Sequence, residues 1–270
     1  MYARNIFRFC VYIFALIGFI LTAGYLAVRF GMTNEKGLID NQDESFLVNL
    51  DMQNASSSMK WAEGEEWEVL KKAVIRDSEV INKAAQDADL NPRLIVAVLV
   101  PEQLRLFHSE REIFKQIFQP LEILGNQNQF SWGIMGLKQE TAKAIENHLK
   151  DETSQFYLGQ EYENALIFTS NDMGGERFER ITNDKDHYYG YLYAALYLKQ
   201  VENQWKKAGF DISARPEILA TLYNIGFDNS KPKAKPYSGG ATIEINGQTY
   251  SFGSLAGKFF NSDELRNEFP

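Results

Sequence analysis

The chain has 270 residues, of which 44% are hydrophobic and 13% aromatic, and it carries a formal net charge of −8 and a single cysteine. Such a chain can bury one substantial core, and the lone cysteine excludes an intramolecular disulfide and a cysteine-based metal site. The acidic balance argues against nucleic-acid binding through a basic patch. The three histidines, His108, His148 and His187, lack metal-ligand spacing, so we read them as surface or packing residues and expect neither metal nor cofactor.

An uncharged apolar run, Phe9–Val28, occupies the N-terminal segment. A helix needs roughly 20 apolar residues to span a bilayer, so this run predicts a transmembrane anchor within residues 1–32. Arg4 and Arg8 precede the run and an acidic stretch follows it, which places the N-terminus in the cytoplasm and the body outside the inner membrane. A cleaved signal peptide is the alternative, but the run exceeds the usual apolar core of about 7–15 residues and no clear A-x-A site follows.

Residues 33–60 are polar and acidic, which is typical of a juxtamembrane linker. The first 30 residues hold three arginines and no acidic residue, so the remainder has 25 basic and 36 acidic residues and a charge of −11. We expect the folded domain to cover residues 61–270. Its first helix is predicted over Gly64–Asp87, where apolar residues recur at helical spacing.

A second helix is predicted over Asn91–Phe107, with Asn91 as its N-cap and Pro92 in its first position. The run is almost entirely apolar and holds one carboxylate, Glu102. Burial disfavours a charged carboxylate, so such a glutamate can hold a proton near neutral pH and deliver it as a general acid. The alternative is an ion pair with Arg105, three residues further along the same face.

Another helix is expected after Phe107, broken near Pro120. The glycine-rich segment that follows, Phe130–Leu137, predicts a turn, which leads into a helix over Gln139–Leu149. Glycines let the backbone of such a turn approach a ligand closely.

Two further helices are predicted over His187–Gln204, which is rich in tyrosine, and over Arg215–Ile225. Most of these tyrosines are expected in the core. Residues 241–252 alternate around Asn246-Gly247, which predicts a β-hairpin, and a last helix-like segment follows. The hairpin would either cap the core or lie beside a binding cleft. The fold class is therefore mainly α with a small C-terminal hairpin.

The order of these motifs resembles the catalytic domain of the lytic transglycosylases of the SLT type, in the lysozyme-like superfamily. That family reads Glu-Ser, then Gly-Leu-Met-Gln-Leu followed by Thr-Ala, then Ala-Tyr-Asn-Ala-Gly. The resemblance covers roughly Trp67 to Phe227. The matching positions are Glu102, Gly133, Met135, Leu137, Thr141, Ala142, Tyr223, Asn224 and Gly226.

The resemblance implies a lysozyme-like helical domain that acts on peptidoglycan glycan strands. Glu102 would be the catalytic acid and then the base, giving 1,6-anhydro ends. It also implies periplasmic placement in a bacterium, with glycan strands as the binding partner; the sequence identifies no envelope protein partner. The implied substrate-binding residues are Gln103, Ser131, Trp132, Gly133, Met135, Tyr223 and Asn224.

Three departures from the family pattern keep other functions open. Gln103 stands where the family has serine, Gly136 where it has glutamine, and Pro101 directly precedes Glu102. These favour a non-catalytic domain that binds peptidoglycan or an envelope partner. A muramidase that hydrolyses with water would need a second carboxylate. By location alone, its candidates are Glu140, Asp172, Asp184 and Asp186.

Overall fold

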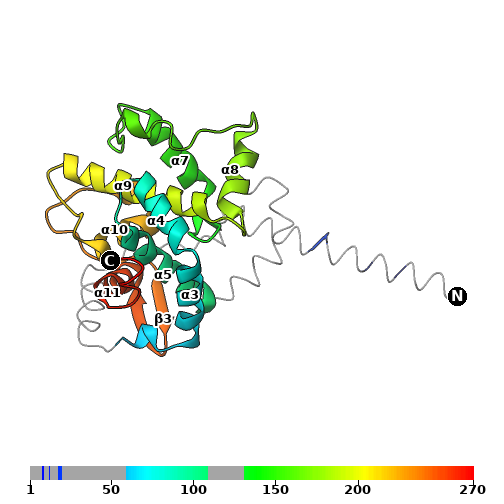
Figure 1. The fold of residues 1–270 in the computed structure, drawn as a ribbon, viewed down its shortest axis with the longest axis vertical. Coiled ribbons are helices and arrows are strands. Elements are labelled where there is room, and N and C mark those ends of the chain that lie inside the picture. The colour runs from blue at the N-terminus through cyan, green and yellow to red at the C-terminus, as the bar shows by residue number, and fades with distance from the viewer. Residues whose placement is uncertain (1–7, 9–11, 13–17, 20–58, 109–130) are drawn as a thin grey trace. The chain divides into compact units, whose positions relative to one another are not determined.

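A computed structural model describes Arg8, Tyr12, Gly18, Phe19 and residues 59–108 and 131–270, without the side chains of 106–108 and 131. The chain divides into two compact units, one of Met1–Lys36 with Glu110–Phe130, the other of Gly37–Ser109 with Ser131–Pro270. All labelled helices and strands in Figure 1 belong to the second unit.

The predicted anchor, linker and post-Phe107 helix lie outside the described residues, apart from a few isolated positions. Across the described positions, no helix combines the length and apolar character that a membrane span requires.

The second unit is mainly helical, with eight α-helices and two short antiparallel strand pairs among its described residues. This confirms the predicted fold class at the level of a helical domain with a small C-terminal hairpin. The α-helices are α3 (Glu65–Arg76), α4 (Ser78–Asp87), α5 (Pro92–His108), α7 (Gln139–Lys150), α8 (Met173–Thr182), α9 (Tyr188–Lys207), α10 (Pro216–Ile225) and α11 (Phe252–Asn261). Shorter elements are the 3-10 helices η1 (Lys60–Ala62), η3 (Gln160–Tyr162) and η4 (Phe227–Asn229), and the strands β1 (Ser131–Trp132), β2 (Leu137–Lys138), β3 (Thr242–Ile245) and β4 (Gln248–Ser251).

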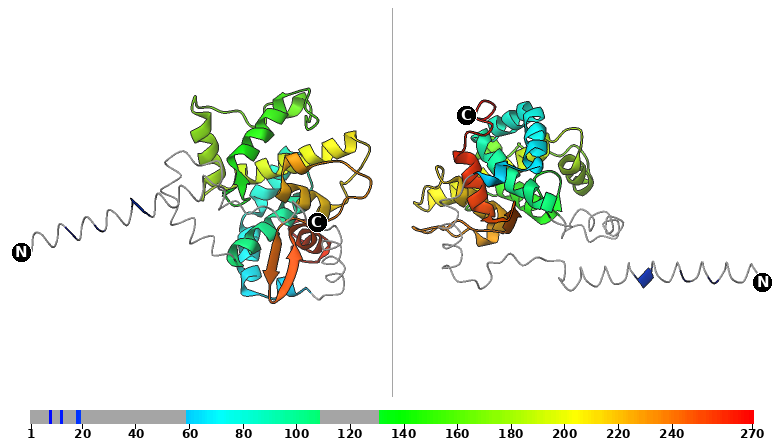
Figure 2. Two further views of the ribbon diagram at one scale, coloured as in Figure 1. Left: turned by 180° about the vertical axis from the view of Figure 1, so that it is seen from behind. Right: turned by 90° about the horizontal axis from the view of Figure 1, so that it is seen from below.

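Helix α5 runs through the core and packs against α3, α4, α10, α11 and β3. Figures 1 and 2 show α7 and α8 at one end of this unit and the β3–β4 hairpin with α11 at the other. Asn91 caps α5 as predicted, because its side-chain oxygen accepts the backbone N–H of Arg93 at 2.8 Å. Every residue from Leu94 to Val100 is buried, so the helix has no solvent-facing side over this stretch.

The helix continues through Pro101, which lies inside its bounds. A proline has no N–H, so the carbonyl of Ala97 loses its usual helical donor at this point. The next residue is Glu102, so the acid of interest sits one position after an interrupted backbone ladder.

Arg93 joins the start of α5 to the C-terminal segment. Its fully buried guanidinium donates to four backbone carbonyls, those of Phe259, Phe260, Ser262 and Phe269, at 2.8–3.0 Å. Carbonyls at the end of a helix lack intrahelical donors and lie at the negative end of its dipole. Burial, with a smaller effect from Arg266, lowers the pKa of Arg93 to about 10, so it stays charged at neutral pH. The cation thus satisfies the end of α11.

The predicted hairpin is present, with Ile245 and Gln248 paired next to its turn. Asn246 and Gly247 have φ values of 51° and 71°, as the two central residues of a type I′ turn require. Ile243, Ile245 and Tyr250 are buried, and the hairpin packs on α5 and α11. It therefore caps the core, which was one of the two expected roles.

The single helix predicted over Gly64–Asp87 is wrong, because α3 ends at Arg76 and α4 begins at Ser78. The break falls at Asp77, whose φ of −89° and ψ of 6° interrupt the regular helix. Asp77 is only 7% exposed, and its carboxylate is hydrogen-bonded to residues of α9 and its N-cap. These tertiary bonds outweigh the continuous helical pattern. An Asp-Ser pair is a recognised helix start, and it was the sequence signal for this break.

Candidate active site

Glu102 lies on α5 and is only 4% exposed. Its Oε1 accepts a hydrogen bond from Nη2 of Arg105 at 2.8 Å, so the ion pair that the sequence offered as the alternative to a free acid is present. The Arg105 side chain is itself mostly buried, at 17% exposure. A buried pair of this kind keeps a carboxylate in place, at the cost of removing both charges from water.

The glycine-rich turn joins β1 to β2, which pair antiparallel through Ser131 with Lys138 and Trp132 with Leu137. Gly133 and Gly136 both have left-handed backbones, with φ values of +63° and +62°. A Cβ on Gly133 would lie 2.1 Å from the carbonyl oxygen of Ile181 in α8. A Cβ on Gly136 would lie 2.1 Å from Oε1 of Glu102. The turn is therefore held between α8 and the carboxylate, and only glycine fits at either end.

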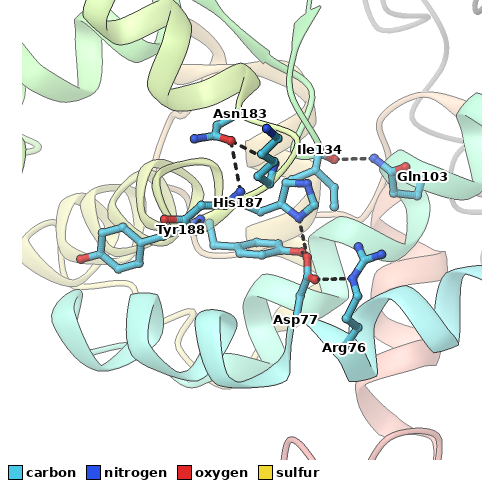
Figure 3. Close-up of polar contacts among 10 residues, drawn as sticks. Arg76, Asp77, Gln103, Ile134, Asn183, His187 and Tyr188 are labelled. Atoms are coloured by element: carbon cyan, nitrogen blue, oxygen red, sulfur yellow. Dashed lines mark hydrogen bonds and ion pairs between the residues drawn. The ribbon is translucent and has the colours of Figure 1, made fainter.

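Two side chains hold consecutive carbonyls of this turn. Gln103 donates from Nε2 to the carbonyl of Ile134 at 2.5 Å, a contact drawn in Figure 3. Tyr223, from α10, donates its hydroxyl to the carbonyl of Met135 at 2.8 Å. Burial and then the nearby charge of Glu102 raise the pKa of Tyr223 well above its ordinary value, so it remains a donor at neutral pH. Gln103 and Tyr223 together fix the turn beside Glu102.

The remaining predicted binding residues are engaged in contacts within the fold. Trp132 is 2% exposed and packs edge-on against Phe178 at 5.0 Å, and Met135 is fully buried. Their side chains lie in the core, so a ligand at this turn would meet its backbone. Asn224 accepts the backbone N–H of Ala241 at 2.8 Å and thereby holds the lead-in to the hairpin. Ser131 takes part through its backbone in β1.

The four acids considered as a second carboxylate are all exposed. Asp172 caps α8 by accepting the N–H of Gly175 at 2.9 Å, and Asp186 accepts the N–H of Tyr188 at 3.0 Å. Glu140 lies in the first turn of α7 and Asp184 in the loop before α9. The structure singles out none of them as a partner of Glu102.

Helix α8, which supports the turn at Gly133, is tied to α7 and α9 by a buried network. Arg177 of α8 forms a two-pronged pair with Glu146 of α7, at 2.5 Å and 2.6 Å. Tyr193 of α9 donates to the same carboxylate at 2.6 Å. A planar guanidinium matched to a carboxylate is among the strongest fixed contacts available to side chains. The network therefore fixes the helix on which one end of the turn rests.

Sequence reasoning missed a second polar cluster, made by Asp77, His187, Tyr191 and Arg76. The carboxylate of Asp77 is hydrogen-bonded by Nδ1 of His187 at 2.5 Å and by the hydroxyl of Tyr191 at 2.9 Å. Nε of Arg76 donates to its other oxygen at 3.0 Å. Burial alone would raise the pKa of Asp77, but the bonds from His187, Arg76 and Tyr191 outweigh it and lower that pKa below 3.8.

Figure 3 shows His187 lying between Asp77 and Ile134 of the turn. Gly190, in the first turn of α9, also faces Ile134, whose side chain would lie 3.5 Å from a Cβ added there. The cluster thus fixes the start of α9 behind the turn. Asp77 and His187 are 110 positions apart, so no local spacing indicated their pairing. His187 is a hydrogen-bonded structural residue rather than a simple surface or packing residue.

No protein-family profile, curated protein or solved structure matches this chain. Within residues 59–108 and 131–270, no group of three or more histidine, cysteine or acidic residues is arranged to hold a metal ion. The function is therefore inferred from the geometry around Glu102.

Proposed function

We propose that the chain is a peptidoglycan lytic transglycosylase with a lysozyme-like domain, anchored in the bacterial inner membrane with that domain in the periplasm. One observation carries the proposal: a buried glutamate lies directly against a glycine turn that a tyrosine from another helix holds in place. Glu102, Gly136 and Tyr223 come from three separate parts of the chain. Their convergence supports a common site.

The reaction needs one carboxylate. Glu102 in its protonated form gives its proton to the oxygen between N-acetylmuramic acid and N-acetylglucosamine, and the bond to C1 breaks through an oxocarbenium-like state. The C6 hydroxyl of the same muramic residue then attacks C1. Glu102, now charged, accepts the hydroxyl proton, and a 1,6-anhydro end forms. The proton that Glu102 gives to the leaving oxygen is replaced by the one from the C6 hydroxyl, and the new bond from that oxygen to C1 replaces the bond that broke.

Arg105 has opposite effects on the two proposed steps. Its guanidinium stabilises the charged carboxylate, which is the form that acts as base in the second step. The first step needs the protonated form, so the ion pair has to open or lengthen when the glycan binds. Gln103 and Tyr223 would meanwhile keep the turn in position for the sugar.

The same ion pair favours a second candidate function. Buried carboxylates paired with a cation also occur as purely structural residues, without any part in catalysis. A domain that binds peptidoglycan without cleaving it fits this observation. A hydrolytic muramidase is supported less, because the four candidate second carboxylates are all exposed and none of them contacts Glu102 in the part of the chain that the structure describes.

The deciding experiment incubates the full chain, in detergent, with purified peptidoglycan and identifies the released muropeptides by mass. Wild type, Glu102→Gln and the exposed control Glu140→Gln are compared. We expect anhydro-muropeptides from wild type and Glu140→Gln, and none from Glu102→Gln. Hydrated products that depend on Glu102 would indicate a muramidase. Binding without any product, from protein shown to be folded, would leave the non-catalytic domain.

A further inference from the structure

The loop of residues 230–240, SKPKAKPYSGG, concentrates positive charge in an acidic protein. Lys231, Lys233 and Lys235 are all exposed, and no acidic residue occurs between Asp228 and Glu244. The chain as a whole carries −8. Three like charges within five residues repel one another, so the pattern does not serve the stability of the loop itself. Local clusters of one sign act instead on charged partners.

Both ends of this cationic loop are fixed in the core. Ser230 is buried and exchanges hydrogen bonds with Gln204 and Trp205 of α9, at 2.5–3.0 Å. At the other end, Gly239 donates its N–H to Oγ1 of Thr221 in α10 at 2.9 Å. Pro232 and Pro236 restrict the backbone in between. The loop therefore presents its lysines from a fixed base.

Two of the three lysines stand apart from the ion pairs of the fold. Among the described residues, no ion pair involves Lys231 or Lys235, whereas Lys71, Arg177 and Lys199 each pair with a carboxylate of another part of the domain. Lys233 lies over the ring of Tyr237, with its Nζ 4.3 Å from the ring centre. Two of the three charges thus remain available for an external anion.

The loop and the proposed catalytic turn are held by the same turn of α10. Thr221 and Asn224 bind the returning strand of the loop through Gly239 and Ala241. Tyr223, between them in sequence, binds the carbonyl of Met135. A ligand that spans from the turn toward the end of α10 would therefore reach the base of the cationic loop.

We propose that the cationic loop binds the carboxylates of the peptide stems on a peptidoglycan strand. This inference rests on the proposed function, because it extends the same substrate away from the cleaved bond. The domain is strongly acidic and its substrate is anionic, so a local cation cluster offsets their repulsion where the strand has to approach. Positive side chains on long flexible stems can follow carboxylates that are themselves mobile.

The test measures co-sedimentation of the full chain in detergent with purified peptidoglycan, in a Glu102→Gln background that prevents cleavage. The variant Lys231→Ala/Lys233→Ala/Lys235→Ala should bind about tenfold more weakly at low salt. The same positions changed to arginine should bind as the parent does. A matched control, Lys143→Ala/Lys150→Ala/Lys185→Ala, removes equal charge from other exposed positions and should bind as the parent does. At about 0.5 M salt the difference should vanish, because exposed charges are then screened.

Equal binding of the loop-alanine variant and its parent at low salt would overturn the inference and leave the proposed function standing. The inference would also be overturned if the lysines still strengthened binding to the same extent when the carboxylates of the peptidoglycan have been amidated. Lysine-dependent binding to phosphatidylglycerol in mixed micelles, without any on peptidoglycan, would assign the loop to the membrane instead. If the parent neither binds nor cleaves peptidoglycan, the proposed function itself fails, and this inference fails with it.

Discussion

Gly136 and Glu102 are so close that a Cβ on the glycine would lie 2.1 Å from Oε1 of the glutamate. The lytic transglycosylase pattern has glutamine at the position of Gly136, so this departure favours a domain without catalysis. In this structure, any side chain there would displace the carboxylate. Gly136 is therefore part of how the turn reaches Glu102, and its effect on stability and activity can be measured.

Gly136→Ala should lower the free energy of unfolding by about 3 kcal/mol, because it combines a left-handed backbone with a clash. Gly209→Ala is the matched control. That glycine has a φ of +86° and nothing within 4 Å of its Cβ position, so it should lose only about 1 kcal/mol. Urea denaturation of both variants provides the comparison. In a Glu102→Ala background, the cost at Gly136 should fall to that at Gly209. Equal costs at the two glycines in wild type would contradict this account.

Removing either side chain that holds the turn should loosen it. Gln103→Leu and Tyr223→Phe each remove the donor to one carbonyl of the turn, and each should cost about 1–2 kcal/mol of stability. Amide hydrogen exchange of the peptide 131–138 should quicken in both variants, and the proposed transglycosylase activity should fall by more than the loss of stability explains. Tyr157→Phe, which removes a tyrosine hydroxyl from Glu163 elsewhere, is the control. Unchanged exchange in the turn would show that these two bonds do not hold it.

Asp77 should make stability depend on pH in the acid range. Its pKa is lowered in the folded state from the ordinary 3.8, so the unfolded chain binds the proton first as pH falls. The stabilisation is present above about pH 4 and is lost as pH falls through the folded value. We expect Asp77→Asn to be less stable than wild type at pH 6, with the gap narrowing toward pH 2. The difference in stability is measured from the urea concentration at the unfolding midpoint across this pH range. The exposed variant Glu79→Gln serves as the control. A gap that is constant with pH would refute the assignment.

Arg93→Met should destabilise the fold by about 3–5 kcal/mol, because it removes a buried cation that donates to four backbone carbonyls. Arg93→Lys keeps the charge but cannot reach all four carbonyls, so it should restore only part of the loss. Arg215→Met, at an exposed ion pair, should cost less than about 1 kcal/mol. Chemical denaturation separates the three. A mild effect at Arg93 would mean that α11 is held by packing alone.

Local sequence signals predicted most of the helical framework. Asn91 with Pro92 marked the start of α5, and proline marked the start of α10, because capping depends on residues next to one another. Asn246-Gly247 marked the hairpin turn for the same reason, since only residues tolerant of positive φ fit there. Asp77-Ser78 was a local signal for the break between α3 and α4, but the helical pattern runs through it, and the hydrogen bond to His187 that favours the break comes from 110 residues away.

The candidate site divides in the same way. The sequence alone indicated Glu102, the glycine turn and the Tyr223-Asn224 pair as candidate site residues and Arg105 as an alternative ion-pair partner of Glu102, since residue types and order carry that information. Only the tertiary structure decided that Trp132 turns into the core, that Asn224 holds the hairpin lead-in, and that Gly136 abuts Glu102. Side-chain direction and contact between distant segments depend on packing, which summed local preferences do not specify.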